Sequence, residues 1–139
     1  MRNDCFLDTN VLIYAAAGKQ DDARKFEIAE RIIANERFCL SGQVLAEFYV
    51  NITRKPEIPL SPSEAELWID ALCAFPVAAV DETLVRTGIV YARKYQIHYF
   101  DAALVAAAER LGAPILYTED LSDGQLYGPV RVVNPFKPD

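Results

Sequence analysis

The chain has 139 residues, of which 52% are hydrophobic and 24% are charged, a composition typical of a globular protein of about one domain. A domain of this length buries roughly two thirds of the surface that its unfolded chain exposes, so it needs neither disulfides nor a structural zinc ion to fold. Its 14 basic and 20 acidic residues give a net charge of −6, which excludes nucleic-acid binding through a broad basic face and restricts any such activity to a local site.

The cysteines, the histidine and the first residues narrow the possibilities further. Cys5, Cys39 and Cys73 each lie in an apolar stretch and form no CxxC pair, which predicts buried thiols in a reducing cytoplasm. The N-terminal residues resemble neither a signal peptide nor a membrane span, so we expect a cytoplasmic protein that does not bind a membrane. The single histidine, His98, excludes sites built on two histidine ligands.

Short apolar runs alternate with stretches of helical periodicity along the chain. In chain order they predict a strand over 5–7, helices over 11–17 and 21–33, a strand over 38–40, a helix between Ser41 and Pro56, a helix from Ser61 through Leu72, a strand over 76–80, a helix after Asp81, an alanine-rich helix from Asp101 to Gly112, and strands over 114–117 and 130–133. The clearest start signal is Ser61-Pro62-Ser63-Glu64, where a capping box is combined with proline at the first helical position.

This order of elements predicts the fold class. Strands that alternate with helices are joined by right-handed crossovers, which place the strands parallel and the helices on the faces of the sheet. We therefore expect a single α/β domain over residues 1–139, with a mostly parallel central sheet of four to five strands and helices on both faces.

Acidic residues stand where the predicted strands end and the helices begin. Asp8 ends the first strand, Glu47 lies in the first two turns of the helix after the second, Asp101 opens the alanine-rich helix, and Asp120 follows the fourth strand. Ligands of open α/β sheets gather at the carboxyl ends of the strands, so these four carboxylates could share one cleft. Converging carboxylates repel one another unless a divalent cation neutralises them, and oxygen ligands favour Mg²⁺ or Mn²⁺. Such a site can generate hydroxide from water and direct it at a phosphodiester.

Each of these acids also has a purely structural interpretation. Asp8 is placed to cap the helix that begins near Asn10, and Asp101 favours the positive end of its own helix. Glu47 is harder to explain in this way, because it lies beside an apolar helix stripe, where we expect a lone carboxylate to be partly desolvated without gain.

The aromatic residues near these helix starts have two interpretations. Tyr14, Tyr99 and Phe100 could stack on nucleobases at the rim of the cleft, or they could pack in the core, as aromatic side chains more often do. His98, three residues before Asp101, is expected to lie in a loop or to cap a helix, and we assign it no role in the chemistry.

Four segments in this order resemble a known family. They are Phe6-Leu7-Asp8-Thr9-Asn10-Val11-Leu12, Ser41-Gly42-Gln43-Val44-Leu45-Ala46-Glu47-Phe48, Tyr99-Phe100-Asp101-Ala102-Ala103 followed by Ala106-Ala107-Ala108, and Leu116-Tyr117-Thr118-Glu119-Asp120. Together they span nearly the whole chain, which resembles the PIN-domain nucleases and, more narrowly, the VapC-type toxin ribonucleases.

The resemblance implies roles for particular residues. It makes Asp8, Glu47 and Asp101 the core acidic triad around Mg²⁺ or Mn²⁺ and adds Asp120 as the fourth acid, two positions beyond Thr118. The neighbouring acids Glu119 and Asp123 remain alternatives to Asp120. The further residues that it implies are Thr9 and Thr118 as hydroxyl partners near the ligands and Asn10 in the first helical turn.

The resemblance also implies an activity and partners. The reaction would be metal-dependent hydrolysis of RNA that leaves a 5′-phosphate and a 3′-hydroxyl. The protein would be a cytoplasmic toxin that forms a homodimer and is paired with a small antitoxin, whose C-terminal segment covers the acidic cleft and places a basic side chain against the carboxylates.

Three other functions compete with this one. A phosphotransfer receiver domain would require paired acids at the end of the first strand, where this chain has Asp8 alone. A haloacid-dehalogenase phosphatase would place a second Asp two residues after the first, where this chain has Asn10. The remaining alternative is a PIN-like module that binds RNA or protein with little or no catalytic turnover.

Overall fold

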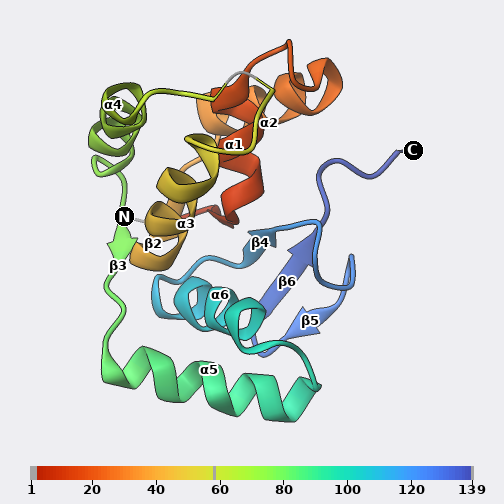
Figure 1. Cartoon of the computed structure of the whole chain (residues 1–139). Coiled ribbons are helices and arrows are strands. Elements are labelled where there is room, and N and C mark those ends of the chain that lie inside the picture. Colours follow the sequence, from red (N-terminus) through yellow and green to blue (C-terminus); the bar gives the residue numbers. More distant parts are fainter. Residues whose placement is uncertain (1–2, 58, 139) are drawn as a thin grey trace.

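The computed structural model describes residues 3–57 and 59–138, and strands alternate with helices along them (Figure 1). The strands are β1 (Cys5–Leu7), β2 (Phe38–Ser41), β3 (Val77–Ala78), β4 (Ile115–Tyr117), β5 (Leu126–Tyr127) and β6 (Val130–Val133). The helices are α1 (Thr9–Ala17), α2 (Ala23–Asn35), α3 (Gly42–Ile52), α4 (Pro62–Leu72), α5 (Glu82–Tyr95) and α6 (Tyr99–Arg110).

The strands of the described residues form one sheet in the order β3-β2-β1-β4-β6-β5. Every neighbouring pair is parallel except β5 and β6, which form an antiparallel hairpin at one edge. At the centre, Phe6 of β1 pairs in register with Cys39 of β2 on one side and with Leu116 of β4 on the other. The parallel arrangement brings the carboxyl ends of β1, β2 and β4 to the same edge of the sheet.

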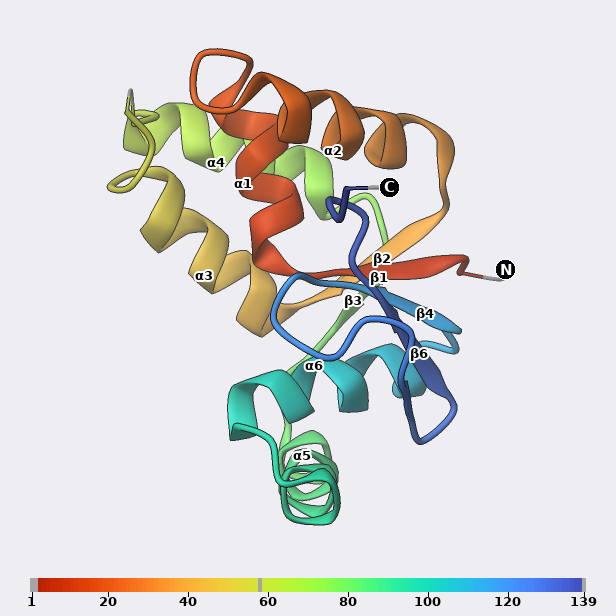
Figure 2. The ribbon, with the colours of Figure 1, turned by 90° about the vertical axis from the view of Figure 1, so that its right-hand side faces the viewer.

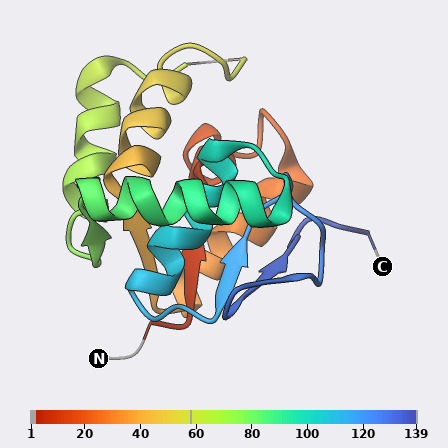
Figure 3. The same ribbon diagram turned by 90° about the horizontal axis from the view of Figure 1, so that it is seen from below.

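Helices cover both faces of this sheet, as Figure 2 shows. One face carries α1 to α4, and the other carries α6 with α5 packed outside it (Figure 3). Because β1 is covered on both sides, Cys5, Phe6 and Leu7 all have 0% exposure, which explains why the strand is a continuous apolar run. The expected α/β class, the mostly parallel sheet and the helices on both faces are confirmed.

Small residues let α6 fit between the sheet and α5. All seven residues from Ala102 to Ala108 are buried, as expected for a helix with neighbours on both sides. On α5, a Cβ added at Gly88 would lie 2.9 Å from the ring of Tyr99, the first residue of α6. This close approach fixes the start of α6.

A side chain caps the start of each described helix by accepting a hydrogen bond from a backbone N–H in the first turn. The capping residues are Asp8, Asp22, Ser41, Ser61, Asp81 and His98. At Ser61 the predicted capping box is complete, because the Glu64 carboxylate also accepts from the backbone N–H of Ser61. His98 was expected to lie in a loop or to cap a helix, and it caps α6: its Nδ1 accepts a hydrogen bond from the N–H of Phe100 at 3.2 Å.

The structure differs from the sequence-based expectation in four places. The short strand β5 was not predicted, β3 is limited to Val77–Ala78 within the predicted 76–80, and α6 begins at Tyr99 instead of Asp101 because His98 supplies the cap. Cys5 and Cys39 are buried as expected, and burial raises the pKa of both thiols, but Cys73 is exposed because it follows the last residue of α4. Within the described residues, no helix has the length and apolar character that a membrane crossing requires.

Candidate functional site

The acids singled out by the sequence come from four different elements at one edge of the sheet. Asp8 follows β1 and caps α1, Glu47 lies on α3, Asp101 is the third residue of α6, and Asp120 follows β4. Figure 2 shows that α1, α3 and α6 begin at this same edge. The parallel strands therefore place these side chains on one side of the molecule, although they are distant in sequence.

Asp8 is a buried carboxylate with a fixed orientation. The residue is only 6% exposed. One carboxylate oxygen accepts a hydrogen bond from the backbone N–H of Thr9 at 2.6 Å, and the other accepts one from the hydroxyl of Thr118 at 2.7 Å. Burial raises the pKa of Asp8 from 3.8 to about 6, the charges of Asp120 and Glu47 raise it as well, and the two hydrogen bonds act in the opposite direction. The protein thus holds an anion at a position that disfavours one.

The hydroxyl of Thr118 joins this carboxylate to the loop after β4. It donates to Asp8 and accepts the backbone N–H of Asp120 at 3.1 Å, and the residue is only 1% exposed. Thr9 contributes in a different way, through its backbone N–H, while its buried hydroxyl has no hydrogen-bond partner among the residues that the structure describes. Asn10 is the second residue of α1 and is half-buried.

Asp101 lies in the first turn of α6 and responds to the same charges. Burial raises its pKa, the carboxylates of Asp120 and Glu47 raise it too, and the nearby His98 lowers it. Asp8 and Asp101 are therefore both affected by Asp120 and Glu47, so that the four acids form one electrostatic cluster.

Glu47 reaches this cluster from an exposed position. The expectation that it would be partly desolvated is wrong, because Glu47 is exposed on α3. Its carboxylate accepts a hydrogen bond from the Nε2 of Gln43 at 2.8 Å, and the same Nε2 lies 3.5 Å from the carbonyl oxygen of Phe100 on α6. Sequence analysis missed Gln43, although a Gln four residues before a Glu on one helix is a recognisable pair.

The loop after β4 carries two more carboxylates, and both have partners elsewhere. Glu119 accepts hydrogen bonds from the Tyr14 hydroxyl at 2.6 Å and from Lys25 at 2.7 Å. Asp123 accepts the N–H of Asn134 at 2.8 Å, which lowers its pKa, with a smaller contribution from Lys137. Asp120 remains as the acid of this loop whose charge acts on Asp8 and Asp101.

The chemistry of these donors suits a hard divalent cation. No cationic side chain that the structure describes forms an ion pair with any of the four acids, and the cluster contains no cysteine. Within residues 3–57 and 59–138, no group of three or more His, Cys, Asp or Glu side chains is placed to hold a metal ion. Mg²⁺ does not need three protein ligands, since it usually binds through one or two carboxylates and keeps several waters. The donor set therefore fits Mg²⁺ or Mn²⁺ better than zinc.

Comparison with known proteins identifies the family. A sheet of this order, with an acidic cluster at the carboxyl ends of its strands, defines an α/β protein with a candidate metal site. The family model of the PIN domain matches residues 5–122, so the chain belongs to the PIN domain family. No curated protein matches it in sequence.

Several solved structures share the fold. The toxin VapC20 of Mycobacterium tuberculosis, described as cleaving the sarcin–ricin loop, has a TM-score of 0.67 and 22% identity over 84% of this chain and 90% of its own. A toxin–antitoxin complex from Klebsiella pneumoniae has a TM-score of 0.70 and 18% identity over 95% and 98%. FitAB bound to the IR36 DNA fragment has a TM-score of 0.67 and 20% identity over 97% of both chains. At these identities the likeness shows the fold.

Proposed function

We propose that this protein is a Mg²⁺- or Mn²⁺-dependent endoribonuclease and the toxin of a toxin–antitoxin pair. The observation that carries the proposal is the buried carboxylate of Asp8, which lacks a cationic partner among the described side chains and whose pKa is raised to about 6 while three further acids stand nearby. Membership of the PIN family and the likeness to VapC20, described as a toxin that cleaves the sarcin–ricin loop, support the same conclusion.

The residues divide the work as follows. Asp8, Glu47, Asp101 and Asp120 would hold the cation, either directly or through its bound waters, and the cation would supply an activated water and stabilise charge on the phosphodiester. Thr118 keeps one oxygen of Asp8 oriented and fixes the backbone of Asp120 through the same hydroxyl. Gln43 orients the carboxylate of Glu47 next to α6. Burial and the charges of Asp120 and Glu47 raise the pKa of Asp101, and His98 offsets part of this rise.

The comparisons also support particular partners. The structural neighbours include toxin–antitoxin complexes, some of them bound to DNA. We infer that this protein acts in the cytoplasm as a homodimer, cleaves RNA, and is inhibited by a small antitoxin that places a basic side chain against the four acids.

The proposal is tested by incubating the purified chain with defined tRNA and rRNA fragments. We expect cleavage with Mg²⁺ or Mn²⁺ and none with EDTA. Asp8→Asn and Glu47→Gln should each abolish cleavage, because each removes one charge from the cation-binding cluster, while circular dichroism shows an unchanged fold. Asp70→Asn is the matched control, since Asp70 is an exposed acid on α4 and should leave cleavage intact. Equal cleavage by wild type and both variants, or cleavage in EDTA, would contradict the proposal.

The alternative is a PIN-like module that binds RNA or protein with little turnover. The observation that favours it is that no group of three or more His, Cys, Asp or Glu among the described residues is placed to hold a metal ion. This alternative predicts that RNA is retained in a gel-shift assay but stays intact with either metal, whereas the nuclease releases shorter products.

A further inference from the structure

Phe100 differs from the other aromatic residues near the acids. This residue is 56% exposed, whereas every other Phe, Tyr or Trp that the structure describes is buried or half-buried. Tyr14 bonds to Glu119 and packs edge-on against Phe136, and the ring of Tyr99 packs against Gly88. The sequence left all three aromatic residues open as base-stacking candidates, and only Phe100 still offers a large apolar surface to solvent.

Neighbouring rings hold Phe100 in place without covering it. The His98 ring stacks on it with centroids 5.7 Å apart and planes 29° apart, and the Tyr99 ring meets it at 69° with a centroid distance of 5.3 Å. His98 is itself fixed, because its Nδ1 caps α6. The orientation of the Phe100 ring is thus largely set before any ligand arrives, which reduces the entropy lost on binding.

A cavity of about 360 Å³ adjoins this ring, lined by Gln43, Ala46, Glu47 and Phe100. It lies between α3 and α6, directly beside Glu47, one of the four candidate metal-binding acids. Within the described residues, both hydrogen bonds of Gln43 use its Nε2, so its amide oxygen remains available as an acceptor. The cavity therefore offers an aromatic face, a methyl group and a polar rim, the combination that recognises a planar heterocycle.

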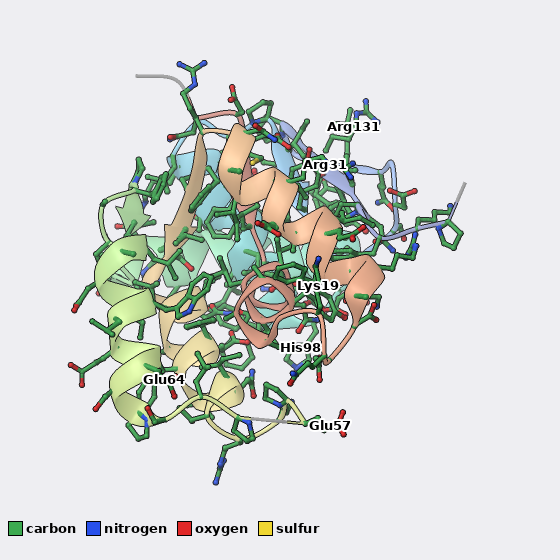
Figure 4. All side chains as sticks on the ribbon, turned by 90° about the horizontal axis from the view of Figure 1, so that it is seen from above. Lys19, Arg31, Glu57, Glu64, His98 and Arg131 are labelled. Atoms are coloured by element: carbon green, nitrogen blue, oxygen red, sulfur yellow. The ribbon has the colours of Figure 1, made fainter. Side chains whose placement is uncertain are left out.

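The local charge decides which part of a nucleic acid can enter. Glu47 lines the cavity, Asp101 follows Phe100, and none of the side chains that line the cavity is basic. In the view of Figure 4, Arg31 and Arg131 lie toward the opposite end of the molecule from His98, and Lys19 is the labelled basic residue nearest to it. A bare phosphate would be repelled here, but a neutral base would not. In a duplex both faces of a base are covered by its neighbours, so the base must come from an unpaired segment.

We propose that Phe100, with Gln43 at its rim, is a stacking platform for one unpaired nucleobase of single-stranded RNA, next to the phosphate that the acidic cluster acts on. This subsite rests on the proposed nuclease function for its substrate. It supplies attraction that a protein with a net charge of −6 cannot obtain from a basic groove. Loss of one base–aromatic stack lowers affinity by roughly 5- to 150-fold.

A fluorescent base reports the stacking directly. The full chain is titrated into single-stranded RNA of about 12 nucleotides that carries 2-aminopurine at each position in turn, with Ca²⁺ in place of Mg²⁺ and the RNA checked for integrity on a gel. We expect the fluorescence to be quenched at one or two positions. The quenching should be lost in Phe100→Ala and Phe100→Leu and retained in Phe100→Tyr, because the effect requires an aromatic ring and not merely an apolar side chain.

A matched control and an abasic substrate separate stacking from general damage. Leu67→Ala removes an apolar side chain that is 68% exposed on α4 and should change neither quenching nor affinity. RNA that lacks the base at the quenched position should be cleaved by wild type as slowly as intact RNA is cleaved by Phe100→Ala. The Phe100→Ala variant should lose nothing further on the abasic RNA.

The outcomes distinguish this proposal from the nuclease proposal. Persistent quenching in Phe100→Ala, or Phe100 variants that bind and cleave like Leu67→Ala, would overturn the platform and leave the nuclease intact. Phe100-dependent quenching in a chain that cleaves no RNA would support the platform and overturn the nuclease. If Phe100→Ala weakens binding of a protein partner and leaves RNA binding unchanged, the surface docks protein and the platform is wrong.

Discussion

The position of Asp8 suits the proposed cation site but lowers the stability of the metal-free fold. An ordinary aspartate caps a helix from a solvated position, but Asp8 caps α1 from a site where it is only 6% exposed and where Asp120 and Glu47 add repulsion. Two hydrogen bonds offset part of this cost without removing it. Buried carboxylates of this kind are stabilised fully only when a cation arrives.

The pKa of Asp8 leads to a prediction for the metal-free protein. The pKa of Asp8 rises from 3.8 to about 6 on folding. Between these two pH values the folded protein keeps the proton of Asp8, whereas the unfolded chain releases it. The free energy of unfolding therefore falls as the pH rises through this window. The loss is on the order of 3 kcal/mol. We expect the free energy of unfolding of Asp8→Asn to depend less on pH and to exceed that of wild type above pH 6. Urea unfolding in the presence of EDTA measures both. Asp70→Asn should keep the wild-type slope; a wild-type slope in Asp8→Asn would contradict the burial argument.

The sequence could single out the acids but not the environment of each one. Helix starts and strand ends pointed to Asp8, Glu47, Asp101 and Asp120, because parallel strands bring distant positions to one edge. That Glu47 is exposed, or that Glu119 bonds to Tyr14 and Lys25, depends on how α1, α2 and α3 pack, which periodicity does not specify. Likewise, the sequence limited His98 to a loop or a helix cap but did not show that it caps α6 and moves the start of this helix to Tyr99.

At the scale of elements, prediction succeeded where the signal lies within one segment. Every described helix begins at a capping residue, and the apolar strands β1 and β2 are fully buried. The strand β5 was missed because Leu126–Tyr127 is too short to show a period of its own. The two-residue Gly128-Pro129 connection to β6 was the available hairpin signal, since glycine supplies the positive φ that such turns require.

Gly128 in this hairpin predicts a measurable effect on stability. It has a φ of +55°, and a Cβ there would lie 2.5 Å from the hydroxyl oxygen of Tyr91, which donates a hydrogen bond to Glu109. Gly128→Ala should therefore cost about 2–4 kcal/mol, from left-handed backbone strain together with overpacking against α5. Gly124→Ala is the control for strain alone, because its φ is +85° but its Cβ would meet nothing within 4 Å. If urea denaturation shows equal losses of stability in Gly128→Ala and Gly124→Ala, then Tyr91 moves aside without an energetic cost and the overpacking argument is wrong.

At the scale of the whole molecule, the fold concentrates negative charge at one edge of the sheet. The chain carries a net charge of −6, and four of its acids lie at the carboxyl ends of the strands: one follows β1, two lie on α3 and α6, and one lies in the loop after β4. Other acids are neutralised locally, as Glu119 is by Lys25 and Asp81 by Arg110. In the cluster, by contrast, the charges of Asp120 and Glu47 raise the pKa of Asp8 and Asp101, so a bound cation would relieve repulsion there.

Cation binding should therefore stabilise the whole fold. A ligand that binds the folded state alone contributes about 2.7 kcal/mol at 100 times its Kd, which for a chain of this size corresponds to about 5–10 °C in Tm. We expect Mn²⁺ to raise the Tm of wild type and Asp70→Asn by such an amount well above pH 6, as differential scanning calorimetry would show. The rise should shrink below pH 6, where protonation of Asp8 competes with the metal, and should be largely absent in Asp8→Asn. Na⁺ at equal ionic strength controls for screening, and a rise in Asp8→Asn as large as in wild type would place the binding of Mn²⁺ away from this carboxylate.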